Sequence, residues 1–170
     1  MTKHIGVKLI NAFPMTRLAY NNFRGWQLPA DENGADEGYL VEYLDGGKPN
    51  TDRFDGYISW SPKDVFDNAY RPVSGLSFGL AIEALKLGKC VARAGWNGKG
   101  MHLWLNRSAF AGEPPVSHIQ GVSISFFDAY EGDVVTRLPN INMCSADGST
   151  VTGWLASQTD ILAEDWNIVE

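Results

Sequence analysis

The chain has 170 residues, of which 44% are hydrophobic, 12% aromatic and 20% charged, and its formal net charge is -6. This length suits one medium domain or two small ones, and the low charge content with 18 glycines favours short strands joined by turns. The negative net charge and the lack of clustered lysine and arginine exclude binding to the phosphate backbone of DNA or RNA. A small anionic ligand is compatible with this charge, because a few backbone N–H groups can bind one phosphate.

The first part of the chain predicts a small α+β module. Alternating hydrophobicity predicts a strand over residues 6–12, and Thr16 is placed to cap a helix over 17–23. Strands are predicted over 39–44 and 57–60. A stretch rich in glycine, aspartate and asparagine separates these two strands, which favours a hairpin.

A second helix is predicted directly after this hairpin. Ser61 is expected to be its N-cap, with Pro62 at the first helical position and Asp64 at the third. The buried face of the helix is expected to consist of Val65, Phe66, Ala69 and Tyr70.

Residues 71–77 are expected to separate two modules, because proline and glycine flank a short polar step and a new helix signal follows. We predict an N-terminal α+β accessory module over residues 1–74 and a ligand-binding module over 75–170. The sequence shows no internal repeat that would argue for another organisation.

The second module predicts a helix packed on a sheet. Ser77 is expected to cap a helix over 78–87, and Gly88 ends it. Asp147-Gly148 is typical of a tight hairpin, and residues 107–120 predict a long exposed loop. Strands are predicted over 90–93, 101–106, 122–127, 141–146, 150–154 and 167–169. The predicted fold class is therefore α+β, with two small modules that each pack short helices on an antiparallel sheet.

Neither a membrane span nor a metal centre is predicted. No stretch approaches the roughly 18 consecutive apolar residues of a membrane helix, and the first residues lack the apolar centre of a signal peptide, so we expect a cytoplasmic protein. The two cysteines, Cys90 and Cys144, are too few for a disulfide framework or a zinc motif and are expected to be free thiols. No cofactor is expected.

The stretch Trp96-Asn97-Gly98-Lys99-Gly100-Met101 is a glycine-rich turn with more chemistry than a simple hairpin needs. An indole can stack on a base, an asparagine can bond a base edge or a ribose hydroxyl, and N–H groups beside glycines can bind a phosphate. The alternative is a tight hairpin whose tryptophan fills the core, and residue types alone favour it.

A second polar run follows Trp154. Ser157 or Thr159 is placed to cap a short helix, and the cap requires only one of them. Gln158 and Asp160 could then line a pocket, since aspartate often accepts hydrogen bonds from ribose hydroxyls. Both interpretations stay open.

A catalytic site is not expected. The best set that the chain offers is Cys144 or Ser145 as nucleophile, with His102 as base and Asp147 beside it. The sequence lacks a nucleophile elbow, a Walker motif and a paired-histidine metal motif, and its three histidines are scattered.

The acidic stretch Asp31 to Glu37 is typical of a solvated loop, but it could also face a partner. A different class of function is therefore open: residues 1–76 could be a protein-interaction module that uses this stretch or the aromatic strand face at Tyr57 and Trp60.

Several motifs occur in order along the second module. Residues 77–86 read SFGLAIEALK and residues 91–101 read VARAGWNGKGM; Leu138-Pro139, Ala146-Asp147-Gly148 and residues 154–166, WLASQTDILAEDW, follow. Together they resemble the Thoeris anti-defense 2 family of phage proteins across nearly all of 77–170. Residues 1–76 are outside this likeness and resemble a small module of other phage proteins.

The resemblance implies a protein of the infected bacterial cytoplasm that binds an immune signal without cleaving it. The signal would be of the cyclic ADP-ribose type, such as glycocyclic ADP-ribose (gcADPR) made by TIR enzymes of Thoeris immunity. Some members also hold cyclic dinucleotides, which connects the family to cyclic-oligonucleotide (CBASS) immunity. Homotetramers with ligand pockets between subunits are implied, and a hydrolase of the same signal is the alternative.

The resemblance also implies which residues bind the ligand. Trp96 would stack on a base, Asn97 and Asp160 would bond ribose or base edges, and backbone N–H groups near 98–100 would meet phosphates. The full set of expected ligand-binding residues is Trp96, Asn97, Ser157, Thr159 and Asp160, with Phe78, Met101 and Met143 as weaker members.

Overall fold

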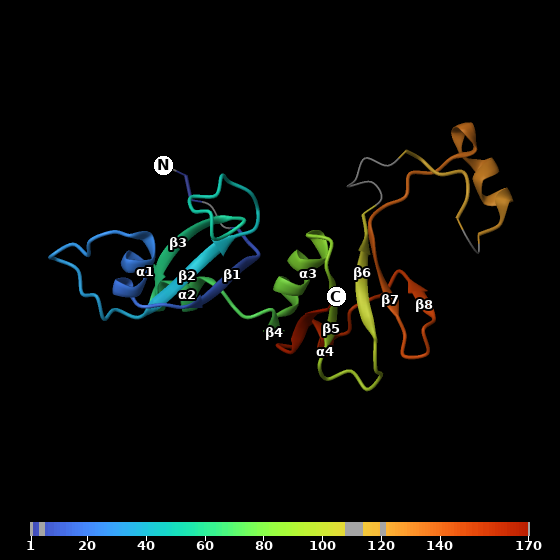
Figure 1. Cartoon of the computed structure of the whole chain (residues 1–170). Helices are drawn as coiled ribbons and strands as arrows, with labels where there is room; N and C mark the ends of the chain where they lie inside the picture. Colours follow the sequence, from blue (N-terminus) through green and yellow to red (C-terminus); the bar gives the residue numbers. More distant parts are fainter. Residues whose placement is uncertain (1, 4–5, 108–113, 120–121, 170) are drawn as a thin grey trace. The chain divides into compact units, whose positions relative to one another are not determined.

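The structure is a computed structural model and describes residues 2–3, 6–107, 114–119 and 122–169. The chain forms two compact units, Met1–Arg71 (unit 1) and Pro72–Glu170 (unit 2), which are described separately below (Figure 1). Each unit contains short helices and one antiparallel sheet, so the predicted α+β class is confirmed. No described helix is long and apolar enough to cross a membrane.

Unit 1 is a three-stranded sheet with two helices. The strand order is β1-β2-β3, and both pairings are antiparallel. The predicted cap of the first helix is confirmed, because the Thr16 hydroxyl accepts a hydrogen bond from the Ala19 N–H at 3.3 Å. The elements are β1 Ile10–Pro14, α1 Arg17–Arg24, β2 Gly38–Tyr43, β3 Tyr57–Pro62 and α2 Lys63–Ala69.

The core of unit 1 joins α1 to the sheet. Tyr20 of α1 is buried against Leu40 of β2 and Ile58 of β3, and Trp60 packs at the edge of this cluster. Burying side chains of this size contributes about 1.5–3 kcal/mol each. These contacts position α1 and β3, which contribute Arg17 and Trp60 to the pockets of this unit.

Two predictions for unit 1 need correction. The first strand lies over Ile10–Pro14 rather than 6–12, because its pairing with β2 places Phe13 opposite Leu40. Ser61 is not a helix cap: it continues β3, where it pairs with Tyr39, and its hydroxyl donates to the Pro62 carbonyl instead. Pairing with β2 therefore extends the strand through the expected cap.

The predicted buried face of α2 is also wrong in part. Val65 is 54% exposed and Ala69 is exposed. Phe66 is half-buried, and its ring stacks on Tyr39 of β2 with centroids 4.0 Å apart. A two-turn helix on a three-stranded sheet covers only the rings directly below it.

Unit 2 contains a six-stranded antiparallel sheet with the order β4-β9-β5-β6-β7-β8. The last strand of the chain lies between β4 and β5, which brings the residues before β9 beside the end of β5. The elements are β4 Ser74–Leu76, α3 Phe78–Lys86, β5 Cys90–Arg93, β6 His102–Asn106, the 3-10 helices η2 Ile124–Ala129 and η3 Glu131–Asp133, β7 Asn140–Cys144, β8 Thr150–Thr152, α4 Gln158–Ile161 and β9 Trp166–Val169.

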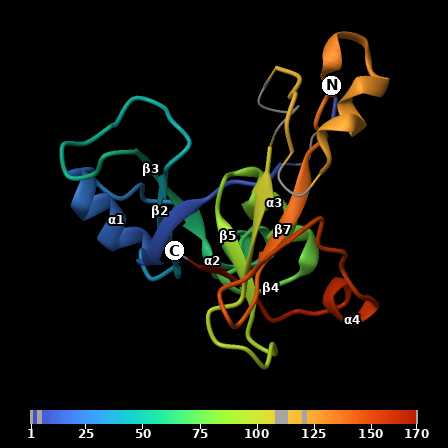
Figure 2. The same ribbon diagram turned by 90° about the vertical axis from the view of Figure 1, so that its right-hand side faces the viewer.

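The core of unit 2 lies between α3 and the sheet (Figures 1 and 2). Trp166, Val91 and Leu103 are fully buried on neighbouring strands, and Ala81 and Leu85 of α3 pack against them. The helical spacing of the α3 residues explains why one face of the helix meets the sheet.

The helix over residues 78–86 agrees with the prediction, and Gly88 follows it with a φ of 81°. Ser77 occupies the N-cap position, but its side chain makes no capping hydrogen bond. Positive φ carries no steric cost for glycine, which explains the stop at Gly88.

The strand predicted over 122–127 is wrong, because this segment forms η2. The N–H of Phe126 bonds the Ser123 carbonyl, and that of Tyr130 bonds the Phe127 carbonyl. The ring of Phe126 contacts those of both Phe127 and Tyr130, an arrangement that a strand would not allow because side chains alternate there. Residues 108–113 and 120 of the predicted loop lie outside the described residues.

Candidate ligand-binding site

The turn between β5 and β6 contains the predicted Trp96 site. Gly98 is packed tightly: a Cβ added there would lie 2.5 Å from the Ala146 Cβ and 2.5 Å from the Met101 sulfur. Only glycine fits at such a close approach. The turn therefore rests on Ala146 of the turn between β7 and β8, and Met101 forms part of its packing.

Asp165 fastens the start of this turn to the segment that precedes β9. Its carboxylate accepts a hydrogen bond from the Gly95 N–H at 2.7 Å and one from the Arg93 Nε at 2.8 Å. Its own carbonyl accepts from the Ala94 N–H at 3.0 Å. The hydrogen bond from Arg93 lowers the pKa of Asp165 despite partial burial.

Asp160 forms the centre of the site and is 9% exposed. One oxygen accepts from Arg93 Nη1 at 2.9 Å and from the Trp96 indole N–H at 3.2 Å. The other oxygen accepts from the Ser157 hydroxyl at 2.5 Å and from the Ser157 N–H at 3.1 Å. A carboxylate has about four lone-pair sites, so these donors occupy all of them.

These hydrogen bonds keep Asp160 ionised. Burial by itself raises the pKa of this carboxyl, but donors on Ser157, Arg93 and Trp96 outweigh it and lower the pKa to about 2. Asp160 is thus an anion that holds its neighbours in place. Binding a ribose hydroxyl, the role expected from the sequence, would require exchanging one of these internal bonds.

Ser157, one of the two cap candidates in the sequence, caps α4 and forms a capping box with Asp160. Since the Ser157 hydroxyl hydrogen goes to Asp160, the Thr159 hydroxyl, 2.8 Å from the Ser157 oxygen, is the donor of that contact. Thr159 is exposed and keeps its own oxygen available as an acceptor.

Trp96 also belongs to a cluster of three tryptophans. Its ring meets Trp166 edge to face at 5.4 Å and Trp154 at 6.2 Å, measured between centroids. Phe78 contacts Trp166 from α3 at 5.4 Å. Trp96 is half-buried. Part of its ring packs against the core, as the alternative of a core-filling tryptophan expects, and part reaches solvent.

The predicted residues fall into three groups. Trp96, Ser157, Thr159, Asp160 and Phe78 are joined by the contacts above. Asn97 is an exposed residue of the turn, and Met101 touches Gly98. Met143 lies on β7 opposite Leu103 and Val151 and packs against the core, away from the Asp160 hydrogen bonds.

Sequence reasoning missed Arg93 and Asp165 as members of the site. The available signal was an arginine at the end of a short apolar strand, where a partly buried guanidinium needs a carboxylate partner. The partner could not be identified, because it is 72 residues away along the chain.

The surface beside this network is both polar and apolar. Asn97, Lys99 and Thr159 are exposed around the turn and α4. Leu155, Ile161 and Leu162 are 89%, 46% and 76% exposed; Leu155 precedes α4, Ile161 is its last residue and Leu162 follows it.

The nucleophile set considered from the sequence is not joined by hydrogen bonds among the described residues. His102 lies opposite Cys144 in the β6–β7 pairing, but its Nδ1 is 2.8 Å from the Gly100 carbonyl. The Asp147 carboxylate accepts from the Ser149 N–H at 2.9 Å. Within the described ranges, no three His, Cys, Asp or Glu side chains are grouped to hold a metal ion.

Two comparisons with known proteins concern this unit. The family model described as the Thoeris anti-defense 2-like domain matches residues 76–169. The chain is also similar to "Thoeris anti-defense 2" of Bacillus phage SP01, with 40% identity over 95 residues, which is 55% of this chain and 94% of that relative. The family match begins after unit 1 ends.

Proposed function

The chain belongs to the Thoeris anti-defense 2-like family, and from this premise we propose that it is a phage anti-defense protein that binds and sequesters a nucleotide immune signal without cleaving it. The signal is of the cyclic ADP-ribose type, such as glycocyclic ADP-ribose, and cyclic dinucleotides are a second class to test. The site of action is the cytoplasm of the infected bacterium, where such signals are made.

The observation that carries this proposal is the way the Trp96 turn is held. Arg93, Asp160 and Asp165 fasten the turn by charge-assisted hydrogen bonds, which fixes the half-buried indole in one orientation. A preformed aromatic surface reduces the entropy lost on binding, and tight binding is all that sequestration requires. The indole would stack on a base of the signal.

Polar contacts would come from the exposed groups around the turn. Asn97 and Thr159 carry free hydrogen-bonding capacity that suits base edges and ribose hydroxyls. Backbone N–H groups of residues 98–100 would meet phosphate oxygens. Asp160 would act by orienting Trp96 and α4.

A neighbouring subunit would complete the pocket. The apolar side chains of Leu155, Ile161 and Leu162 beside α4 support this part of the proposal, because their burial between subunits would stabilise an assembly such as a homotetramer. The ligand would then be enclosed from two sides.

The proposal is tested by calorimetry with cyclic ADP-ribose isomers and cyclic dinucleotides, followed by heating the complex and identifying the released compound by mass spectrometry. Binding and release of the intact compound are expected. A hydrolysed product would support the hydrolase alternative, which the variants Cys144→Ala, Ser145→Ala and His102→Ala would then have to inactivate.

Asn97→Ala measures the contribution of one polar side chain to nucleotide affinity. This residue is exposed and makes no hydrogen bond to any described residue, so its loss should leave the melting temperature unchanged. We expect roughly tenfold weaker binding, the value of one good hydrogen bond. Thr152→Ala on β8 is the matched control and should bind normally.

A further inference from the structure

Unit 1 has two adjoining open pockets, of about 560 and 590 Å³, that share Arg17 and Trp60. Together they form a surface that we call the Trp60 groove. It lies in the part of the chain that precedes the family match, so the proposed function of unit 2 does not account for it.

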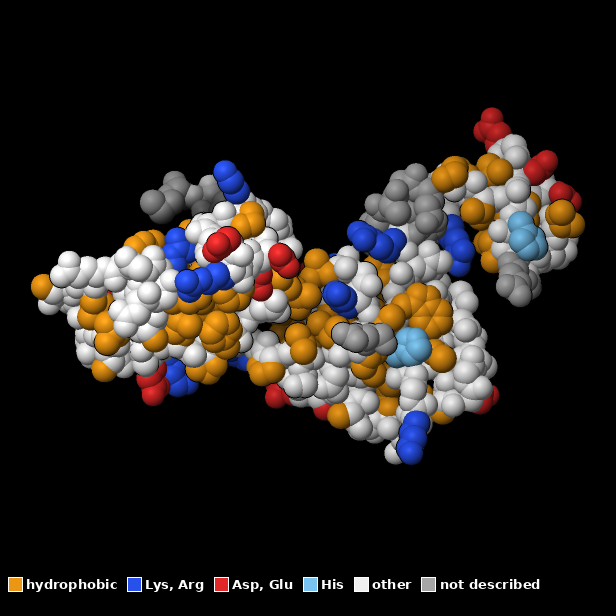
Figure 3. Space-filling view, in the orientation of Figure 1, with side chains coloured by type: hydrophobic (Ala, Val, Ile, Leu, Met, Phe, Trp, Pro, Cys, Tyr) orange, Lys and Arg blue, Asp and Glu red, His pale blue; other side chains and the backbone are white. Residues whose placement is uncertain are grey.

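The floor of the groove is aromatic and held in place. The Trp60 indole N–H donates to the Met15 carbonyl at 2.8 Å, and the Arg17 guanidinium lies 4.3 Å from the ring centroid. Trp26 and Tyr57 extend this floor and are 53% and 45% exposed. Hydrophobic side chains also reach the surface of this unit in the space-filling view (Figure 3). Exposed rings on a rigid floor are typical of a binding surface.

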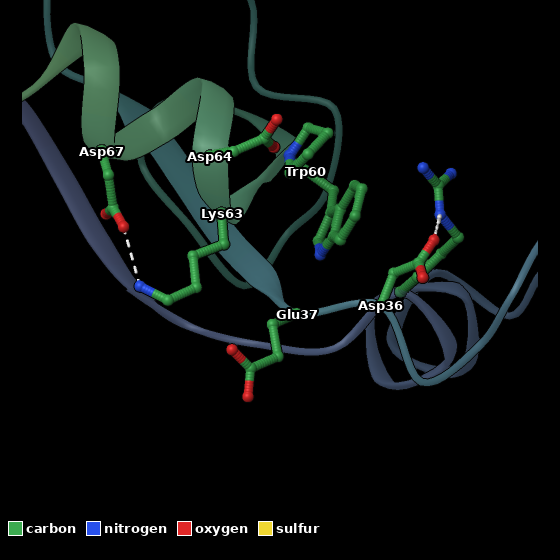
Figure 4. Close-up of a pocket in the computed structure, with 8 residues that line it drawn as sticks. Asp36, Glu37, Trp60, Lys63, Asp64 and Asp67 are labelled. Atoms are coloured by element: carbon green, nitrogen blue, oxygen red, sulfur yellow. Dashed lines mark hydrogen bonds and ion pairs between the residues drawn. The ribbon is translucent and has the colours of Figure 1, made fainter.

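The rim of the groove is acidic. Five carboxylates line the two pockets, against the two cations Arg17 and Lys63. Lys63 pairs with Asp67 at 2.7 Å and Arg17 with Glu32 at 2.8 Å. Figure 4 shows Trp60 among these side chains, with Asp64 of α2 on one side and Asp36 on the other.

Two rim carboxylates are not neutralised by a salt bridge. Glu37 and Asp64 pair with no cation that the structure describes, although the charge of Glu37 contributes to the raised pKa of Lys63. The groove therefore keeps net negative charge next to exposed aromatic rings. Carboxylates without such rings would be typical of a solvated loop. The aromatic floor of the Trp60 groove beside them provides a surface on which a partner side chain can pack.

The structure also unites two features that were alternatives in the sequence. Glu32, Asp36 and Glu37 of the acidic stretch line the same groove as Tyr57 and Trp60 of the aromatic strand face. The fold brings them together because Trp60 pairs with Leu40 of β2, and the acidic stretch leads directly into that strand.

We propose that the Trp60 groove docks a basic segment of a partner protein. An arginine or lysine side chain of the partner lies over the aromatic floor, with its charge facing Glu37 and Asp64. The internal Arg17–Trp60 contact uses the same cation–π geometry. Negative charge opposes nucleic acid and anionic membranes here, whereas complementary charge steers a basic protein toward the groove.

The probe is a synthetic peptide, acetyl-Gly-Arg-Gly-Lys-Gly-Arg-Gly-amide, titrated into the full-length protein while the indole N–H signals are followed by NMR. The same peptide with glutamate in place of its basic residues is the negative probe. We expect saturable binding of the basic peptide with a shift of the Trp60 signal, identified from the Trp60→Phe variant. The glutamate peptide should not bind.

Charge-matched variants separate docking from general attraction. The double variant Glu37→Gln/Asp64→Asn should weaken peptide binding about tenfold, since two partly screened ion pairs are lost. The variant Asp31→Asn/Asp52→Asn removes the same charge from exposed positions outside both pockets and should change affinity less than twofold. Equal losses in both variants, or no binding to the wild type, would overturn the proposal.

Nucleotide binding by unit 2 is the internal control. Glu37→Gln/Asp64→Asn should leave the nucleotide affinity measured by calorimetry unchanged. The experiment can therefore contradict the docking proposal and the proposed nucleotide binding independently of each other. A decrease in self-association when the peptide binds, detected by light scattering, would identify a second copy as the occupant that the peptide displaces and would contradict a basic partner segment.

Discussion

Asp160 holds together the elements around the proposed binding site. Its four hydrogen bonds join β5, the Trp96 turn and α4, and its neighbour Trp166 donates its indole N–H to the Asp160 carbonyl at 3.0 Å. Removing its charge would loosen all of these elements at once. The residue is therefore a sensitive point for stability as well as for binding.

Asp160→Asn tests this role through the pH dependence of unfolding. The pKa of the folded carboxyl is about 2, below its ordinary value of 3.8, so its contribution to stability is complete above about pH 4 and is lost as the pH falls through 2. At pH 7 the variant should lose roughly 2 kcal/mol of unfolding free energy in urea titrations.

The difference between wild type and variant should shrink as the pH falls from 4 to 2. Asp147→Asn is the comparison, because this carboxyl is outside the site and bonds only the turn around Ser149. If the wild type and Asp160→Asn lose stability in parallel over this pH range, the assigned role of Asp160 is wrong.

At the scale of elements, the Trp96 turn depends on close packing at Gly98. Gly98→Ala would place a methyl group 2.5 Å from the Ala146 Cβ, so the Trp96 turn must move away from the turn between β7 and β8. We expect a loss of about 1–3 kcal/mol in unfolding free energy, as in other overpacked positions, together with weaker nucleotide binding by calorimetry.

Gly100→Ala is the matched control in the same turn. A Cβ there meets nothing within 4 Å, and its cost is the strain of a φ of 75°, about 1 kcal/mol. Binding should fall further in Gly98→Ala than in Gly100→Ala. The reverse order would mean that the contact with Ala146 does not set the geometry of the site.

At the scale of the whole molecule, the proposed pocket requires more than one subunit. Leu155→Glu and Leu162→Glu introduce charge at side chains that are 89% and 76% exposed in the single chain. If these residues are buried between subunits, each variant should reduce the assembly measured by light scattering and weaken nucleotide binding at least tenfold.

Leu87→Glu provides the control, because Leu87 is 53% exposed at the end of α3 rather than beside α4. It should assemble and bind as the wild type does. A wild-type protein that binds nucleotide as a monomer would contradict the shared pocket, while leaving sequestration itself intact.

The sequence by itself determined the local elements of this protein. Thr16 was predicted as a helix cap and Ser157 was one of two cap candidates, and both side chains accept the backbone hydrogen bond of an N-cap. The helix at 78–86 and the strand at 90–93 also followed from the local pattern. Capping and periodicity depend on residues within one or two turns, so the sequence alone contains the necessary information. The motifs of unit 2 likewise identified its family.

Only the tertiary structure decided how the site is held together. The insertion of β9 between β4 and β5 brings Asp165 to Arg93, and α4 brings Asp160 to Trp96, 64 residues away along the chain. These long-range contacts occupy one carboxylate oxygen of Asp160, and the local capping contacts of Ser157 occupy the other. Strand order depends on burying the whole apolar surface of the unit, and no local pattern records which distant side chains this burial will bring together.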